Sequence, residues 1–240
     1  ISGLVKFGSV ATIGGATVEK PGTIALPAQT LRDITSSFSG DATATLESAG
    51  DTVVLSAGKA KSTMKTLVHD DFPTLPVPES PKASFSLPGA LLRTLITTVA
   101  SCASVSTVRP ELASVLLSAE GGMIKAVATD SFRLAEKKVS VQGSLTPFSI
   151  LIPAKNASDV VATIPDTEVK VLIDEHQCAF TWAEGLVVTR LVAMPYPDYT
   201  QIIPKSFMTE ATLLRKDFEQ GLRRASIFSD AFQKVRLALD

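Results

Sequence analysis

Acidic residues stand beside histidines at two places, a combination that can hold a metal ion or exchange protons. His69 precedes Asp70 and Asp71, and His176 follows Asp174 and Glu175. The two histidines are far apart in the sequence, and each lies in a polar turn. Such histidines are more often surface residues than zinc ligands, so we expect no metal site.

Asp130 is the best single candidate for a catalytic carboxylate. It lies in the polar turn Thr129-Asp130-Ser131 without a paired acid or base, so capping of its own turn is the default interpretation. The sequence contains no Gly-rich phosphate loop. We therefore predict a protein that is not an enzyme and needs no cofactor. The alternative is a hydrolase that uses Asp130 and an acid such as Asp174 on a β-rich scaffold.

The Asp130 turn joins two strand-like runs, Met123–Ala128 and Phe132–Val139, which predict a β-hairpin. Apolar residues do not recur there at helical spacing. In the second run, strand alternation would place Phe132 and Leu134 on one face and Arg133 on the other. An ordinary half-buried hairpin is the alternative to a binding site at this turn.

Composition limits the classes of protein to consider. The chain has 240 residues, 45% of them hydrophobic, and a net charge of −1. This length suits two units of ordinary domain size, and the charge excludes a uniformly basic nucleic-acid binder. Two cysteines in apolar runs indicate a reducing compartment. Because no signal peptide or long apolar run is seen, we expect a soluble cytoplasmic protein without membrane contact.

An internal repeat organises the chain. Ile24–Gln29 returns as Ile150–Lys155, which gives a period of about 125 residues. Aliphatic-proline pairs end at Pro27, Pro88 and Pro153, each just before a helical pattern, and proline favours the first position of a helix. Three strand-like runs follow each of these helices. The repeating half-unit is therefore a strand, a helix and three strands.

This pattern predicts an α+β fold of tandem half-units, with helices on one side and sheets on the other. Proline-rich stretches at 72–82 and 194–204 read as extended connectors between domains. We therefore predict a partial first domain over 1–80, a complete second domain over 81–206 and the start of a third over 207–240. Ile1 in place of a methionine and a last segment that stops within a strand pattern suggest a piece of a longer protein.

Positive charge gathers on the predicted helices. The four helical stretches hold seven basic side chains and only four acids, which leaves the strands and loops acidic. A polyanion held through its phosphates would explain this distribution, whereas ordinary solvated helix faces would explain it equally well. The predicted DNA-facing residues are Arg32, Arg93, Lys155, Arg215, Lys216, Arg223 and Arg224.

With its repeat, the chain resembles the β sliding clamp of bacterial replicative DNA polymerase. The resemblance covers nearly all 240 residues and is carried by the order and spacing of three motifs: Ala128–Leu134, Arg109–Leu112, and Tyr196–Tyr199 leading to Ile203-Pro204. It implies a ring of two subunits, each with three similar domains, whose helices line a bore around duplex DNA. Such a ring has no chemistry of its own and confers processivity on the polymerase.

The resemblance also implies a pocket that accepts short peptides from polymerases, the clamp loader and repair proteins. Ile227 and Phe228 resemble the apolar pair that the family places at its subunit interface. The remaining alternative is a repeat-built protein-interaction scaffold that binds no DNA. Matching positions assign the pocket to Leu112, Thr129, Ser131, Phe132, Arg133, Leu134, Pro197, Gln201 and Ile202.

Overall fold

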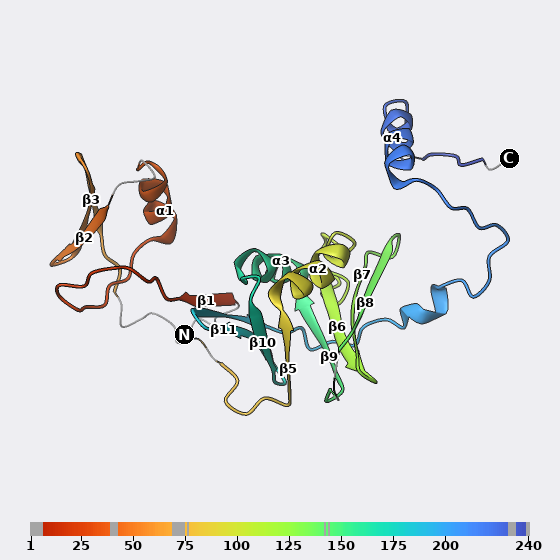
Figure 1. The fold of residues 1–240 in the computed structure, drawn as a ribbon, viewed down its shortest axis with the longest axis horizontal. Coiled ribbons are helices and arrows are strands. Elements are labelled where there is room, and N and C mark those ends of the chain that lie inside the picture. Colours follow the sequence, from red (N-terminus) through yellow and green to blue (C-terminus); the bar gives the residue numbers. More distant parts are fainter. Residues whose placement is uncertain are drawn as a thin grey trace. The chain divides into compact units, whose positions relative to one another are not determined.

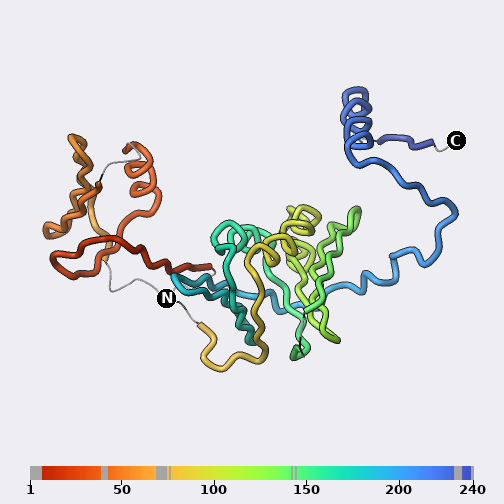
Figure 2. Tube along the Cα trace, in the orientation of Figure 1, coloured from red at the N-terminus to blue at the C-terminus, as the bar shows by residue number. Residues whose placement is uncertain are grey.

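A computed structural model describes residues 7–38, 43–68, 75, 77–141, 143, 145–229 and 234–238. The chain divides into two compact units, Ile1–Tyr196 and Pro197–Asp240, which are considered separately (Figures 1 and 2). His69, Asp70 and Asp71 lie outside the described residues. No helix in the described part of the chain is long and apolar enough to cross a membrane.

Two half-units, each with a strand before its helix and three strands after it, form the centre of the first unit. The first half-unit comprises β5 (Ala83–Pro88), α2 (Gly89–Ala100), β6 (Ser114–Glu120), β7 (Met123–Thr129) and β8 (Leu134–Ser140). The second comprises β9 (Phe148–Pro153), α3 (Ala154–Thr163), β10 (Glu168–Ile173), β11 (Gln177–Trp182) and β12 (Gly185–Arg190). The predicted half-unit is thus confirmed.

The half-units exchange their first strands. β9 joins β6 in a sheet of order β8-β7-β6-β9, and β5 joins β10 in a sheet of order β1-β12-β11-β10-β5. The added edge strand, β1 (Phe7–Ala11), pairs antiparallel with β12, with Phe7 opposite Thr189. The three strands that follow each helix therefore form a sheet with the first strand of the other half-unit.

The helices α2 and α3 lie next to each other on one side of these sheets (Figure 1). Leu92, Leu95, Ile96 and Val99 form the buried face of α2, at the three-and-four spacing of an amphipathic helix. They pack into one core with the inner faces of both sheets, including the fully buried Phe180. The predicted α+β arrangement is confirmed.

A helix follows each proline pair, as predicted. Each proline is the N-cap residue, however, and not the first residue of the helix as expected. Pro27, Pro88 and Pro153 are N-cap residues with φ of −62°, −55° and −48°. These angles are close to the value that the pyrrolidine ring imposes, so each proline sets the direction of the helix that follows.

A smaller module in the first unit repeats the pattern. The helix α1 (Ala28–Ser36) is followed by the meander β2 (Ala44–Ala49), β3 (Thr52–Ala57) and β4 (Ala60–Lys65). Val53, Leu55 and Met64 form its buried core, with Leu31 and Ile34 of α1 packed against it.

The second unit contains the short 3₁₀ helix η1 (Tyr199–Ile202) and the helix α4 (Arg215–Ser226). η1 lies in the stretch predicted to be an extended connector, so that prediction is wrong at this point. Phe218 and Leu222 of α4 are each 37% exposed, and the helix has no buried residue.

Candidate functional site

The turn between β7 and β8 is closed by its own aspartate. The Oδ1 atom of Asp130 accepts hydrogen bonds from the backbone N–H groups of Phe132 at 2.9 Å and Arg133 at 2.7 Å. Its Oδ2 atom accepts two more from Nε and Nη2 of Arg133, at 3.0 and 2.9 Å. The two backbone bonds, and then the Arg133 side chain, lower the pKa of Asp130 to about 2. The carboxylate is ionised at neutral pH and serves as an acceptor.

These bonds correct the predicted strand. Because Phe132 and Arg133 give their N–H groups to Asp130, both belong to the turn, and β8 begins at Leu134. The alternation expected to separate Phe132 from Arg133 therefore does not apply. A carboxylate that competes for backbone N–H groups shortens a strand in this way.

Two further features fix the shape of the turn. The Thr129 hydroxyl donates to the Arg133 carbonyl oxygen at 2.7 Å and accepts from the Ser131 N–H at 3.1 Å. Ser131 has a φ of +76°, the one positive value for a residue other than glycine among the described residues. Residues other than glycine rarely adopt this backbone conformation, and it persists where surrounding hydrogen bonds enforce it.

The turn brings five predicted pocket residues together and gives them different exposures. Phe132 is 95% exposed, whereas Thr129 is buried beneath the turn. Ser131 and Arg133 are exposed, and Leu134 is half-buried. The sixth residue predicted for this unit, Leu112, is buried in the segment between α2 and β6, where its carbonyl oxygen accepts from the Ser104 N–H at 2.8 Å.

Tyr196 was not predicted as a pocket residue, yet it reaches the turn from the end of the first unit. Burial raises the pKa of its hydroxyl to about 12, and the backbone of Thr129 lowers this pKa by a smaller amount. A phenol that is apolar along its ring and polar at its tip suits such a position. The signal in the sequence was its place in the Tyr196–Tyr199 motif.

The other predicted pocket residues, Pro197, Gln201 and Ile202, belong to the second unit. Asp198 caps η1: its Oδ1 atom accepts from the Thr200 N–H at 3.1 Å and from the Thr200 hydroxyl at 2.6 Å, and its Oδ2 atom accepts from Nε2 of Gln201 at 2.8 Å. The Thr200 and Gln201 side chains, followed by the Thr200 backbone, lower the pKa of Asp198. Ile202 is 67% exposed at the end of this short helix.

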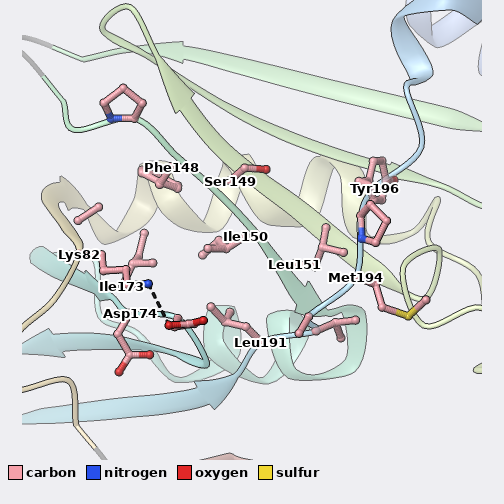
Figure 3. A pocket seen from close by; sticks show the side chains of 16 residues that line it. Lys82, Phe148, Ser149, Ile150, Leu151, Ile173, Asp174, Leu191, Met194 and Tyr196 are labelled. Carbon is pink, nitrogen blue, oxygen red and sulfur yellow. Dashed lines mark hydrogen bonds and ion pairs between the residues drawn. The ribbon is translucent and has the colours of Figure 1, made fainter.

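A hollow of about 540 Å³ opens beside Tyr196 within the first unit. Figure 3 shows Ile150, Leu151 and Leu191 lining it, with Lys82 near its edge. Lys82 donates to the Glu175 carboxylate at 3.0 Å. The hollow lies where the strands β5, β9 and β10 meet residues 191–196, and it contains none of the predicted pocket residues.

The seven predicted DNA-facing residues differ in their surroundings. Arg93 is bound to α3: its guanidinium donates to the carbonyl oxygens of Val161 at 3.2 Å and Ile164 at 2.7 Å, and it pairs with Asp166. On α4, Arg223 pairs with Glu219 and Arg224 contacts Gln220. The structure records no such bond, within its described part, for the exposed side chains of Arg32, Lys155, Arg215 and Lys216.

Asp130 and Asp174, the two carboxylates of the hydrolase alternative, both accept hydrogen bonds from backbone N–H groups of their own turns. Asp174 accepts from the N–H groups of His176 at 2.8 Å and Gln177 at 2.9 Å, much as Asp130 does in its own turn. Across the described residues, no cluster of three or more His, Cys, Asp or Glu side chains could hold a metal ion. The geometry at these turns is that of structural caps.

Comparison with known proteins agrees with this architecture. Residues 86–198 match the family described as DNA polymerase III beta subunit, central domain. The beta sliding clamp of Synechococcus elongatus is 29% identical over 238 residues, covering 96% of this chain and 63% of that protein. The beta sliding clamp of Bacillus subtilis is 31% identical over 217 residues, covering 89% of this chain and 57% of that protein.

Solved structures give the same answer. The Bacillus subtilis sliding clamp superimposes with a TM-score of 0.84 at 29% identity, over 94% of this chain and 62% of that one. A Pseudomonas aeruginosa sliding clamp bound to griselimycin gives 0.84 at 25% identity, over 96% of this chain and 63% of that one. This chain is similar in sequence and in fold to beta sliding clamps.

The region matched to the clamp central domain contains most of the candidate site. Its bounds, 86 and 198, enclose the Asp130 turn, Tyr196, Pro197 and Asp198, while Gln201 and Ile202 follow directly. The chain spans about 60% of the length of the curated clamps that it matches.

Proposed function

We propose that this chain belongs to a sliding clamp that encircles duplex DNA and keeps the replicative DNA polymerase on its template. The observation that carries this proposal is the gathering of α2 and α3 on one side of the sheets, in a chain similar to clamps over nearly all its length. Such a protein tethers topologically and needs no catalytic group. Its place of action is the cytoplasm.

The DNA side of the proposed ring is the helix face. Arg32 and Lys155 on α1 and α3, and Arg215 and Lys216 on α4, are exposed and suited to phosphate contacts. A few such cations hold the backbone loosely and read no bases, so the ring slides. The ring is a homodimer, with Ile227 and Phe228, which are 75% and 89% exposed, at the subunit interface.

The peptide side uses the Asp130 turn together with Pro197, Gln201 and Ile202. Phe132 in the first unit and Ile202 in the second are each exposed apolar side chains of the kind that anchors short peptides. The proposed partners are peptides of DNA polymerase, the clamp loader and repair proteins. Griselimycin, which is bound to the Pseudomonas aeruginosa clamp, is a suitable probe of ligand binding by this chain.

The proposed domains are a partial first domain over 1–80, a central domain over 81–206 and the start of a third over 207–240. The family match over 86–198 falls inside the proposed central domain. The repeat of about 125 residues supports equal domain sizes.

Topological retention on DNA tests the proposal. The labelled protein is loaded by its clamp loader onto nicked circular plasmid, and a restriction enzyme then cuts the plasmid once. We expect the protein to stay on the circle and to be lost rapidly after cutting, because a ring can slide off the end of linear DNA. Equal retention on both forms would indicate DNA binding that does not depend on a closed ring and would contradict a clamp. No retention on the circle would also contradict a clamp and would favour a scaffold that binds no DNA.

A further inference from the structure

The hollow in the first unit has the open edge of a strand as one of its walls. Within its sheet, β9 pairs with β6 only. The Leu151 carbonyl oxygen accepts from the Val192 N–H at 2.9 Å, so the main-chain groups of Leu151 point away from β6. Because these groups alternate in direction along an antiparallel strand, the N–H and carbonyl oxygen of Ser149 also point away from β6.

Ser149 lines the hollow, and Figure 3 shows it on the strand beside the cavity. Among the described residues, the structure records no hydrogen-bond partner for its N–H or its carbonyl oxygen. An edge that presents main-chain groups without partners is a template for pairing with another chain.

The walls around this edge are apolar. Leu151, Ile173 and Leu191 contribute aliphatic side chains. Phe148 stacks on Phe85 of β5, with the ring centroids 5.4 Å apart, and so joins the two sheets beside the hollow. The volume of about 540 Å³ falls within the range of pockets that hold ligands. An extended peptide that pairs with a strand edge places alternate side chains into pockets of this kind.

The charged side chains of the hollow sum to a net negative charge. Among the lining residues, Lys82 is positive, and Asp174 and Glu175 are negative. The side chains of Lys82 and Glu175 are each 66% exposed, so water screens their ion pair. Asp174 accepts hydrogen bonds from two backbone N–H groups and from Nε2 of Gln177, none of which is charged, so its own charge is not neutralised. A basic ligand therefore complements the hollow.

We propose that this hollow binds an extended peptide segment that carries an aliphatic side chain between basic residues. The segment adds to the edge of β9 through the N–H and carbonyl oxygen of Ser149. Its aliphatic side chain enters the hollow, and its basic residues lie beside Asp174 and Glu175. The hollow belongs to the first unit and contains no residue of the Asp130 turn, so the inference does not depend on the proposed peptide pocket.

Three hexapeptides with blocked ends test the proposal. The first is Lys-Thr-Leu-Thr-Val-Lys, the second has Glu in place of both Lys, and the third is the basic peptide with an N-methyl group on each Thr. Isothermal titration gives the affinity of each for the whole chain. The basic peptide is expected to bind roughly fivefold or more tightly than the other two, because they lose the charge complement or the hydrogen bonds to the edge.

Two results with the peptides would overturn the proposal. Tighter binding of the acidic peptide would mean that the charge argument is wrong. Equal binding of the N-methylated peptide would show that the hollow takes an apolar cation without strand pairing. If the wild-type chain does not bind the basic peptide, the inference is wrong, while the test of retention on circular DNA is unaffected.

The ion pair at the edge of the hollow supplies two variants with opposite expected effects. Glu175→Gln should weaken binding of the basic peptide roughly twofold to fivefold, and the difference should fade with added salt. Lys82→Gln should strengthen binding by a similar factor, because it removes a repelling charge and releases Glu175. Both variants break the same ion pair, so a change in the same direction in both would overturn the proposal.

Ser149→Pro tests the strand edge itself. The substitution removes only an N–H that points away from β6, a position at which an edge strand tolerates proline. It should weaken binding of the basic peptide roughly fivefold. Ser149→Ala is the matched control, because it removes the hydroxyl, keeps the N–H and should leave the affinity unchanged.

Unchanged affinity in Ser149→Pro, or an equal loss in Ser149→Ala, would overturn pairing at the edge. Urea unfolding followed by the fluorescence of Trp182 shows whether each variant is folded. If Ser149→Pro does not fold, the N-methylated peptide decides the same point on the wild-type chain.

Discussion

Gly89 illustrates how closely the main chain approaches itself at the start of a helix. It is the first residue of α2, and its N–H donates to the Thr167 carbonyl oxygen at 2.8 Å. A Cβ atom there would stand 1.8 Å from the Pro165 carbonyl oxygen, a backbone atom that cannot rotate away. We predict that Gly89→Ala destabilises the first unit by about 1–3 kcal/mol. Urea unfolding followed by the fluorescence of Trp182, the sole tryptophan, measures this.

Gly221 is the control for this prediction. It also lies in a helix, α4, but a Cβ atom added there meets nothing within 4 Å. Gly221→Ala should therefore raise helix content slightly and leave the Trp182 transition unchanged, because alanine is the better helix former by about 1 kcal/mol. If both substitutions shift the Trp182 transition alike, the steric argument at Gly89 is wrong.

At the scale of elements, Arg93 joins α2 to the end of α3. Its side chain satisfies the carbonyl oxygens of Val161 and Ile164, which lie at the C-terminus of α3, where helix carbonyls lack partners. We predict that Arg93→Met keeps the packing of the stem but costs roughly 1–3 kcal/mol, since the carbonyl groups lose their donor. The urea midpoint of the Trp182 transition should fall.

Lys155→Met is the matched control on α3, where the side chain is exposed. It removes one positive charge, as Arg93→Met does, and should leave the urea midpoint within the error of the measurement. If Lys155→Met lowers the midpoint as much, loss of helix charge rather than loss of the Arg93 contacts explains both results.

The elements also show what a sequence can and cannot predict. Helix starts after Pro88 and Pro153 were predicted correctly because proline fixes φ locally. The pairing of β1 with β12 was not predicted, because it joins segments far apart in the chain and depends on tertiary structure. The bonds from Arg93 to Val161 and Ile164 were not predicted, because polarity indicates a face of a helix but not the neighbour that a side chain contacts.

The candidate site was predictable in part for the same reason. The six residues from Thr129 to Leu134 are neighbours in sequence, so one turn brings them together. The beginning of β8 was misplaced because alternation ignores a side chain that takes backbone N–H groups from the ladder. The role of Tyr196 required its burial against Thr129, which no local pattern indicates.

At the scale of the whole molecule, only a few positively charged side chains are available to contact the proposed DNA partner. Three of the seven predicted cations are engaged by neighbours: Arg93, Arg223 and Arg224. Exposed cations held in this way contribute less to phosphate binding than cations without such bonds. The proposed grip on DNA therefore depends mainly on Arg32, Lys155, Arg215 and Lys216. A weak grip of this kind is what a ring needs in order to slide.

Reversal of these four charges tests that distribution. In the protein with Glu at all four positions, loading onto circular DNA should fall at least tenfold, because repulsion replaces phosphate attraction. The magnitude of the slope of log affinity against log salt should decrease by about 3.6, since each of the four lost phosphate contacts contributes roughly 0.9. Filter retention of the loaded circle over a salt series measures both.

The matched control reverses four lysines on strands, Lys61, Lys65, Lys125 and Lys170. It changes the net charge by the same amount, so a general effect of charge would appear equally in both proteins. If the helix face meets the DNA, the strand variant should load normally and keep the wild-type salt slope, because its new acids lie on strands and not on the helices. Equal loss in the two variants would place the DNA elsewhere than on the helices.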